Sequence, residues 1–176
     1  AKKFKNLYKK NINVINSFFS KKNVINELNK NIKFDLISSF AMFYDVNEPN
    51  LFCKDICDLL KKNGIWILEL SYFPLMLKNL TYDQICHEHA TYYTLTVFNN
   101  IIKKNKLKII DASLNEINGG SIEIICCKKS SKLKPNTKNI NAILSDERKI
   151  NDKSYKNFNK RINETKNLIN MFVELN

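Results

Sequence analysis

Glycine, arginine and long apolar runs are scarce in this chain of 176 residues. The only glycines are Gly64, Gly119 and Gly120, so the sequence holds no glycine-rich turn of the kind that cradles a nucleotide phosphate. No apolar run approaches the roughly 18 residues that a membrane span requires, and the basic, asparagine-rich start lacks the apolar core of a secretory signal. We therefore expect a cytoplasmic protein with no membrane partner.

The five cysteines do not form a recognisable disulfide or zinc framework. They are Cys53, Cys57, Cys86, Cys126 and Cys127, an odd number at irregular spacings, which favours free thiols. Cys53 and Cys57 are four residues apart on a predicted helix, a spacing that suits a metal ion. Two ligands do not complete a tetrahedral zinc site, so no metal is predicted there.

Lysine gives the chain a formal net charge of +12, whereas arginine occurs only at positions 148 and 161. A charge of this size is typical of nucleic-acid binding, but base readout favours the planar fork of arginine, and the lysines are spread along the whole chain. Specific nucleic-acid binding is therefore a distant hypothesis. The same positive field would attract an anionic small substrate, such as a phosphorylated sugar or a nucleotide conjugate.

Helical and strand patterns alternate along the chain, and 44% hydrophobic residues suffice for one folded core. We predict helices over 3–9, 22–30, 48–62 and 94–105, and strands over 13–19, 34–39, 65–70, 108–115 and 121–127. After Pro135, a long polar helical segment with an apolar stripe continues to the end of the chain. This segment either covers the sheet or extends to a neighbour.

Residues 65–70 form the clearest strand, which is apolar on both faces except at its carboxyl end. This pattern predicts a central strand covered by helices on both sides. Ligands of open α/β sheets bind beyond the carboxyl ends of the strands, so the loops after Ser39 and Leu70 are predicted to face one cleft. The last two strands, joined around Asn118, are predicted to close the sheet as an antiparallel pair.

Both histidines of the chain, His87 and His89, lie next to Cys86 and Glu88. The ordinary pKa of histidine is near neutrality, so the pair offers general-base, hydrogen-bonding or metal-binding chemistry. One alternative is a loop or a cap of the helix that starts at Thr94. Another is a zinc site on Cys86, His87 and His89 with Glu88 as the base of a hydrolase, although helical metalloproteases place their histidines four residues apart.

Four segments follow one another in a characteristic order: 34–45, 63–69, 82–89 and 118–121. In this order they resemble S-adenosylmethionine-dependent C-methyltransferases, in particular the sugar C-methyltransferases of deoxysugar biosynthesis. The resemblance covers roughly residues 12–130. It implies a class I methyltransferase fold, an α/β Rossmann-like sheet that is mostly parallel and has an antiparallel last strand.

The resemblance also implies roles for individual residues. His89 is the general base that removes a proton from a carbon beside a carbonyl, Glu88 orients the substrate or tunes the imidazole, and His87 gives support. The resemblance further implies contacts with S-adenosylmethionine from Phe40, Ala41 and Phe43. It implies contacts with the substrate from Cys86, Asp45, Tyr92 and Asn118. The substrate is a small molecule, such as a nucleotide-linked keto sugar. The sugar enzymes carry a tyrosine at the place of Cys86 and a histidine at that of Asp45.

The family's glycine-rich turn and the acidic residue that ends its second strand have no counterpart in this sequence. We therefore expect residues 1–130 to be the C-terminal part of a methyltransferase core that lacks its first two strands, and residues 131–176 to be a helical extension or linker. Flanking domains of the same parent chain would be its partners, and the isolated fragment would be inactive. The alternative is a binding or scaffold module that keeps the fold without the chemistry.

Overall fold

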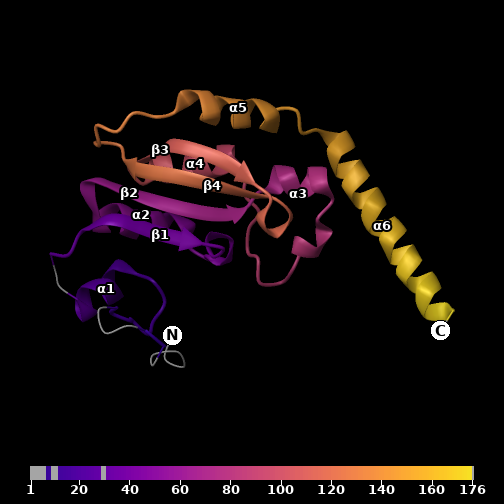
Figure 1. Cartoon of the computed structure of the whole chain (residues 1–176), viewed down its shortest axis with the longest axis horizontal. Helices are drawn as coiled ribbons and strands as arrows, with labels where there is room; N and C mark the ends of the chain where they lie inside the picture. Colours follow the sequence, from indigo (N-terminus) through magenta and orange to yellow (C-terminus); the bar gives the residue numbers. More distant parts are fainter. Residues whose placement is uncertain (1–6, 9–11, 29–30, 176) are drawn as a thin grey trace.

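A four-stranded sheet with the order β1-β2-β4-β3 forms the centre of the molecule (Figure 1). The structure is a computed structural model that describes residues 7–8, 12–28 and 31–175. The strands are β1 (Phe34–Phe40), β2 (Leu60–Ser71), β3 (Leu107–Asn115) and β4 (Ser121–Lys128). β1 and β2 are parallel, whereas β4 runs antiparallel to both β2 and β3. The predicted sheet with a reversed last strand is confirmed.

The described ranges also contain six α-helices. They are α1 (Lys21–Glu27), α2 (Pro49–Leu59), α3 (Phe73–Asn79), α4 (Leu95–Lys104), α5 (Thr137–Glu147) and α6 (Asp152–Glu174). As predicted, α4 begins at Thr94, whose side chain accepts a hydrogen bond from the backbone N–H of Val97. α2 ends before residue 62, because the fully buried Leu60 already pairs with Phe34 in the sheet. No helix in the described parts of the chain has both the length and the hydropathy to cross a membrane.

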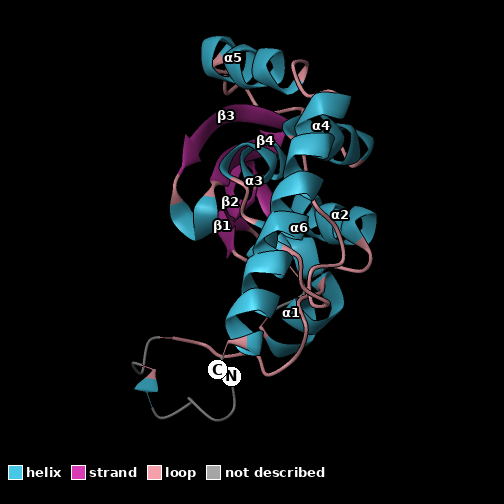
Figure 2. Cartoon of the chain, turned by 90° about the vertical axis from the view of Figure 1, so that its right-hand side faces the viewer, coloured by secondary structure: helices cyan, strands magenta, loops and turns pink. Residues whose placement is uncertain are grey.

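The helices bury one face of the sheet more completely than the other. Trp66, Leu68 and Leu70 of β2 are at most 1% exposed and join the core with side chains of α2 and α4, which lie on the same side of the sheet (Figure 2). On the opposite face, Leu36 and Phe40 of β1 are each 54% exposed. The prediction of helical cover on both faces is therefore wrong for the described residues, because over residues 65–70 of β2 only every second residue is buried.

The predicted strand over 13–19 is also wrong. This stretch is irregular, Phe18 is 97% exposed, and the ring of Phe19 packs 4.8 Å from that of Phe52. No strand of the described sheet pairs with residues 13–19. Ser20, which follows them, caps the start of α1. The helix predicted over 3–9 lies largely outside the described residues.

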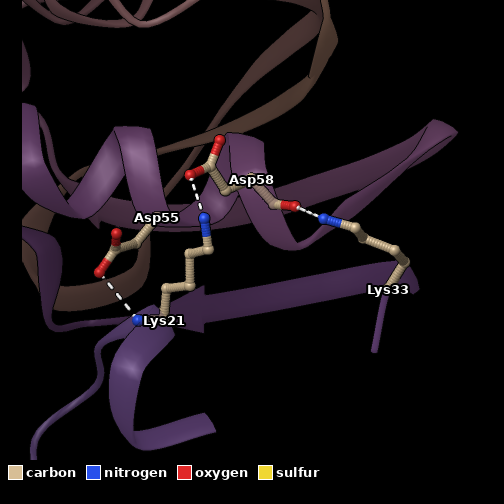
Figure 3. Close-up of polar contacts among 4 residues, drawn as sticks. All are labelled: Lys21, Lys33, Asp55 and Asp58. Atoms are coloured by element: carbon tan, nitrogen blue, oxygen red, sulfur yellow. Dashed lines mark hydrogen bonds and ion pairs between the residues drawn. The ribbon is translucent and has the colours of Figure 1, made fainter. Parts of the chain in front are cut away.

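Lysine side chains fasten the first described segments to α2 (Figure 3). The backbone N–H of Lys21 donates to Asp55 Oδ2 at 2.8 Å, and its Nζ donates to Asp58 Oδ2 at 2.6 Å. Lys33 Nζ donates to the backbone carbonyl of Asp58. The hydrogen bond from Lys21 lowers the pKa of the Asp58 carboxyl below its ordinary value. α1 and the start of β1 are thus both fixed to the C-terminal half of α2.

The C-terminal segment forms two helices rather than one. Asn151 caps the start of α6 after a short break. Ile143 of α5 belongs to the main core, whereas Phe158 of α6 packs against α3 in a smaller cluster. Beyond this contact α6 extends away from the sheet (Figure 1), and Ile169 is 58% exposed. α5 thus packs against the sheet, while α6 is an extension.

Candidate active site

The candidate active site lies at the carboxyl ends of β1 and β2. The chain leaves β1 beside the end of β2, where the backbone N–H of Ala41 donates to the carbonyl of Glu69 at 3.0 Å. The loop then forms a short 3₁₀ turn over Phe43–Asp45. The backbone N–H of Thr91 donates to the carbonyl of Tyr44 at 3.1 Å, which brings the histidine segment to this loop. The two predicted loops therefore meet.

His89 is half-buried beside two tyrosine rings. Its ring centroid lies 4.2 Å from that of Tyr44 and 6.0 Å from that of Tyr92. Its Nδ1 atom is buried and has no hydrogen-bond partner among the described residues. A buried polar atom without a partner costs about 1–3 kcal/mol of stability, so such atoms are uncommon in folded proteins. One nitrogen of this imidazole is thus not committed to the protein.

The rest of the histidine segment is more open to solvent. His87 and Glu88 are exposed, and the described residues provide no hydrogen bond to either side chain. Cys86 is half-buried, and its carbonyl accepts a hydrogen bond from the backbone N–H of His89 at 3.3 Å. This short turn leaves His87 and Glu88 in solvent while His89 packs on Tyr44.

Acidic groups surround the phenol of Tyr44. Burial raises the pKa of Tyr44 above its ordinary value, and electrostatic interactions with Asp45, Cys86 and Glu69 raise it further. Asn115 Nδ2 donates to Glu69 Oε2 at 3.3 Å, which fixes this carboxylate at the end of β2. Two predicted substrate contacts, Asp45 and Cys86, therefore lie near the same phenol.

The three predicted cofactor contacts differ in their exposure. Phe40 is 54% exposed and Ala41 is exposed with a positive φ of 49°. Phe43 is 0% exposed, and its ring packs 5.8 Å from that of Trp66 and 5.4 Å from that of Phe98. Phe43 therefore supports the loop from the core side, and its contact with the cofactor stays a prediction.

Asn118 lies in the turn between β3 and β4, exposed and with a φ of 52°. The carbonyl of Gly119 accepts a hydrogen bond from Asn79 Nδ2 at 2.8 Å, and that of Gly120 accepts one from the backbone N–H of Tyr72 at 3.1 Å. The turn is therefore held against α3 and the end of β2. No hydrogen bond joins Asn118 to the histidine segment in the described ranges.

The cysteines of α2 and the histidine segment do not form a metal cluster. Cys53 is fully buried, and burial raises the pKa of its thiol to about 12. Over the ranges that the structure describes, no group of three or more His, Cys, Asp or Glu side chains is close enough to hold a metal ion. Neither zinc alternative finds a complete ligand set in this geometry.

A separate cavity of about 510 Å³ lies between α3, α5 and α6. Its walls are mainly apolar, with Lys78, Asp146 and Lys149 as charged members. None of the predicted site residues lines it. The cavity is thus distinct from the candidate site at the carboxyl ends of β1 and β2.

Sequence reasoning missed two members of the cleft, Tyr44 and Glu69. Glu69 carries a signal, because it is the one carboxylate near the carboxyl end of an otherwise apolar strand. Tyr44 carries none beyond its place in the loop, since its role follows from its stacking on His89.

A family model described as a methyltransferase domain matches residues 4–112. The chain belongs to this methyltransferase family. A second model, described as a C-methyltransferase C-terminal domain, matches residues 116–175 of this methyltransferase chain. The sheet, with β4 reversed, forms part of this methyltransferase domain, and S-adenosylmethionine is the cofactor of the family.

Among curated proteins, the methyltransferase chain is similar to C-methyltransferase NovU of Streptomyces niveus, with 29% identity over 85 residues. The match covers 48% of this chain but only 20% of the relative, so the chain aligns with about a fifth of that protein.

Two solved structures have a limited similarity to parts of this chain. An S-adenosylmethionine-dependent methyltransferase from Clostridium acetobutylicum is 16% identical, with a TM-score of 0.44 over 59% of this chain and 62% of that chain. A complex of the Haloferax volcanii Trm112 methyltransferase activator with a putative methyltransferase contains a chain that is 11% identical, with a TM-score of 0.46 over 55% of this chain and 54% of that chain.

Proposed function

We propose that this methyltransferase chain supplies the proton-transfer part of a C-methyltransferase site, with His89 as the general base. The observation that carries the proposal is the position of the half-buried His89 imidazole at the carboxyl ends of β1 and β2, packed beside Tyr44 and without a hydrogen bond to any described residue. A base must have a nitrogen that is free to exchange a proton. The exposed His87 lacks this fixed environment.

The residues of the cleft suit an enolate mechanism. Neutral His89 accepts a proton from a substrate carbon beside a carbonyl, and the electron pair of the broken C–H bond delocalises onto the carbonyl oxygen. A tyrosine phenol is protonated at neutral pH, and the raised pKa of Tyr44 extends this to higher pH, so Tyr44 offers a hydrogen-bond donor beside His89 where negative charge develops. When bound, S-adenosylmethionine would supply the electrophilic methyl group that the carbanionic carbon of this enolate accepts.

The residues present fit only part of this cofactor. The exposed ring of Phe40 and the exposed Ala41 at the end of β1 give an apolar surface suited to an adenine ring. The sequence supplies no glycine-rich turn to hold the rest of the cofactor. We propose that flanking segments of the same gene product complete the cofactor cleft.

The substrate proposed is a nucleotide-linked keto sugar or a related anionic small molecule. The resemblance to sugar C-methyltransferases and the similarity to a C-methyltransferase support a carbon acceptor. The net charge of +12 favours an anionic one. Asp45 is next to Tyr44 in the sequence, and Cys86 and the exposed Glu88 precede His89. We propose that these side chains select among such substrates.

A scaffold role is the second candidate, and one observation favours it. The 176 residues hold three glycines, none of them in a cofactor-binding turn, so this chain could keep the fold without performing the reaction. A scaffold would show no turnover even with its flanking segments present.

Transfer of a ¹³C-labelled methyl group tests the proposal. The complete gene product, given labelled S-adenosylmethionine and a nucleotide-linked keto sugar, is expected to form a product whose labelled methyl is bonded to a sugar carbon, as seen by NMR. A label found on oxygen or nitrogen contradicts C-methylation. No transfer to any acceptor tested favours the scaffold.

A further inference from the structure

Glu147, the last residue of α5, accepts four hydrogen bonds with one carboxylate. Tyr72 Oη donates to Oε1 at 2.6 Å, and the backbone N–H of Leu95 donates to the same oxygen. Thr96 donates twice to Oε2, from its backbone N–H at 3.1 Å and from its hydroxyl at 2.5 Å. No predicted role or described site residue accounts for this carboxylate.

These contacts join three elements that are far apart in the sequence. Leu95 and Thr96 are the first two residues of α4, so Glu147 satisfies two of the backbone N–H groups that a helix start leaves unpaired. Its negative charge also lies at the positive end of the helix dipole. Tyr72 follows directly after β2. One residue of α5 thus ties the start of α4 to the end of β2.

The segment between these anchors carries His89. Tyr93 forms an isolated parallel bridge with Tyr72, and its carbonyl accepts a hydrogen bond from the backbone N–H of Phe73 at 3.0 Å. Closer to His89 in the sequence, the backbone N–H of Thr91 donates a hydrogen bond to the carbonyl of Tyr44. The short path from His89 to α4 is therefore fixed near both of its ends.

We infer that Glu147 is a positioning residue, which holds the start of α4 and Tyr72 so that His89 stays packed against Tyr44. Glu147 itself does not touch His89. The geometric effect stands on the contacts alone, whereas its importance for methyl transfer rests on the proposed function. A helix cap without this role would change the stability of the chain but leave the surroundings of His89 intact while the chain is folded.

The two histidines allow a direct test by NMR on the 176-residue chain. His89 packs on aromatic rings and His87 is exposed, so their imidazole signals differ, and each can be assigned by substitution. In Glu147→Ala, under conditions where the chain is fully folded, the signals of His89 are expected to shift toward those of His87. The His87 signals stay in place. Glu147→Gln keeps one accepting oxygen, so it should show a smaller shift.

Amide exchange gives a second readout. Hydrogen bonds to a charged group are strong, so residues 91–96 of Glu147→Ala should exchange on the order of ten to a hundred times faster. The matched control is Asp146→Asn, which removes a neighbouring carboxylate of α5 that binds Lys149 on the surface. This variant should leave both His89 and residues 91–96 unchanged.

The inference is overturned if the His89 signals of Glu147→Ala match those of the parent chain, or if Asp146→Asn moves them equally. It is also overturned if His89 changes only in proportion to the unfolded fraction. These readouts need no turnover. A failure of the methyl-transfer assay would therefore count against the proposed function and leave this inference standing.

Discussion

The ring of His89 is confined by its neighbours in a way that the ring of His87 is not. Tyr44 and Tyr92 pack beside it, which restricts the directions in which its two nitrogens can face. The unpaired Nδ1 carries a cost of about 1–3 kcal/mol, which only a hydrogen-bond partner relieves. Unfavourable features of this kind concentrate at functional sites, where the surrounding fold maintains them.

Another buried polar group, the indole of Trp66, is paired, and its pairing gives a prediction. Trp66 Nε1 donates to Ser39 Oγ at 2.9 Å, and both residues are buried. Ser39→Ala leaves this N–H without its partner, so the free energy of unfolding should fall by about 1–3 kcal/mol. Urea unfolding followed by the fluorescence of Trp66, the one tryptophan of the chain, measures the change.

Ser38→Ala is the matched control, because Ser38 is exposed on the opposite face of β1. It should change the free energy of unfolding by no more than about 0.5 kcal/mol. Equal losses in the two variants would show that the indole hydrogen bond is not the cause.

The pairing of β1 with β2 explains where α2 ends. Leu60 pairs with Phe34 and Ile65 with Leu36, so β2 bulges over residues 61–64. A Cβ atom on Gly64 would lie 2.6 Å from the backbone oxygen of Phe34, which only a glycine avoids. This glycine therefore allows the close approach of two strands.

The contact of α1 with α2 depends on pH through Asp58. The folded-state pKa of this carboxyl is lowered, chiefly by its hydrogen bond from Lys21. A carboxyl with a lowered pKa contributes stability that is present above its unfolded value of about 4 and is lost as the pH falls through the folded value. Asp58→Asn should therefore loosen α1 at neutral pH, and its difference from the parent chain should vanish in acid.

The backbone NMR signals of α1, followed from neutral pH downwards, measure this effect. Asp35→Asn serves as the control, since Asp35 binds Lys61 at an exposed position away from α1. If Asp58→Asn leaves the α1 signals unchanged at neutral pH, the ion pair does not hold the helix.

Sequence patterns predicted the elements whose formation depends on local spacing. The four strands of the sheet, α2 and α4 with its Thr94 cap follow from apolar periodicity and capping residues. The stretch 13–19 has the composition of a strand, but a strand also needs a neighbour with which to pair, and the sequence does not show this. The break before Asn151 was missed because the apolar stripe continues across it.

For the candidate site too, some residues could be predicted from the sequence and others could not. The histidine pair and the two cleft loops could be found from residue type and strand direction. The ranking of His89 over His87 by burial depends on Tyr44, which belongs to a different loop. Glu147 gave no signal at all, since its four donors, from Tyr72 after β2 and from the start of α4, meet only after folding.

At the scale of the whole molecule, the family match and the incomplete cofactor surface must be considered together. Family models match residues 4–112 and 116–175, yet the chain aligns with about a fifth of its curated relative. Leu36 and Phe40 are exposed on the less covered face of the sheet. These features agree with the proposal that further segments complete the methyltransferase.

Cofactor affinity gives a prediction for this scale. Titration calorimetry of residues 1–176 with S-adenosylmethionine should show weak binding or none, because the chain has no glycine-rich turn to hold the cofactor. The complete gene product, titrated in parallel, should bind it more tightly. Tight binding to the 176 residues alone would mean that their cofactor cleft is complete.

Methyl transfer by two histidine variants tests the central claim most directly. In the complete gene product, His89→Ala should lower the rate by about 10²- to 10⁴-fold, the contribution expected of a general base, while His87→Ala should keep most of the activity. Both variants must remain folded, which the fluorescence of Trp66 checks. If His89→Ala keeps full activity, or if His87→Ala loses as much, His89 is not the base.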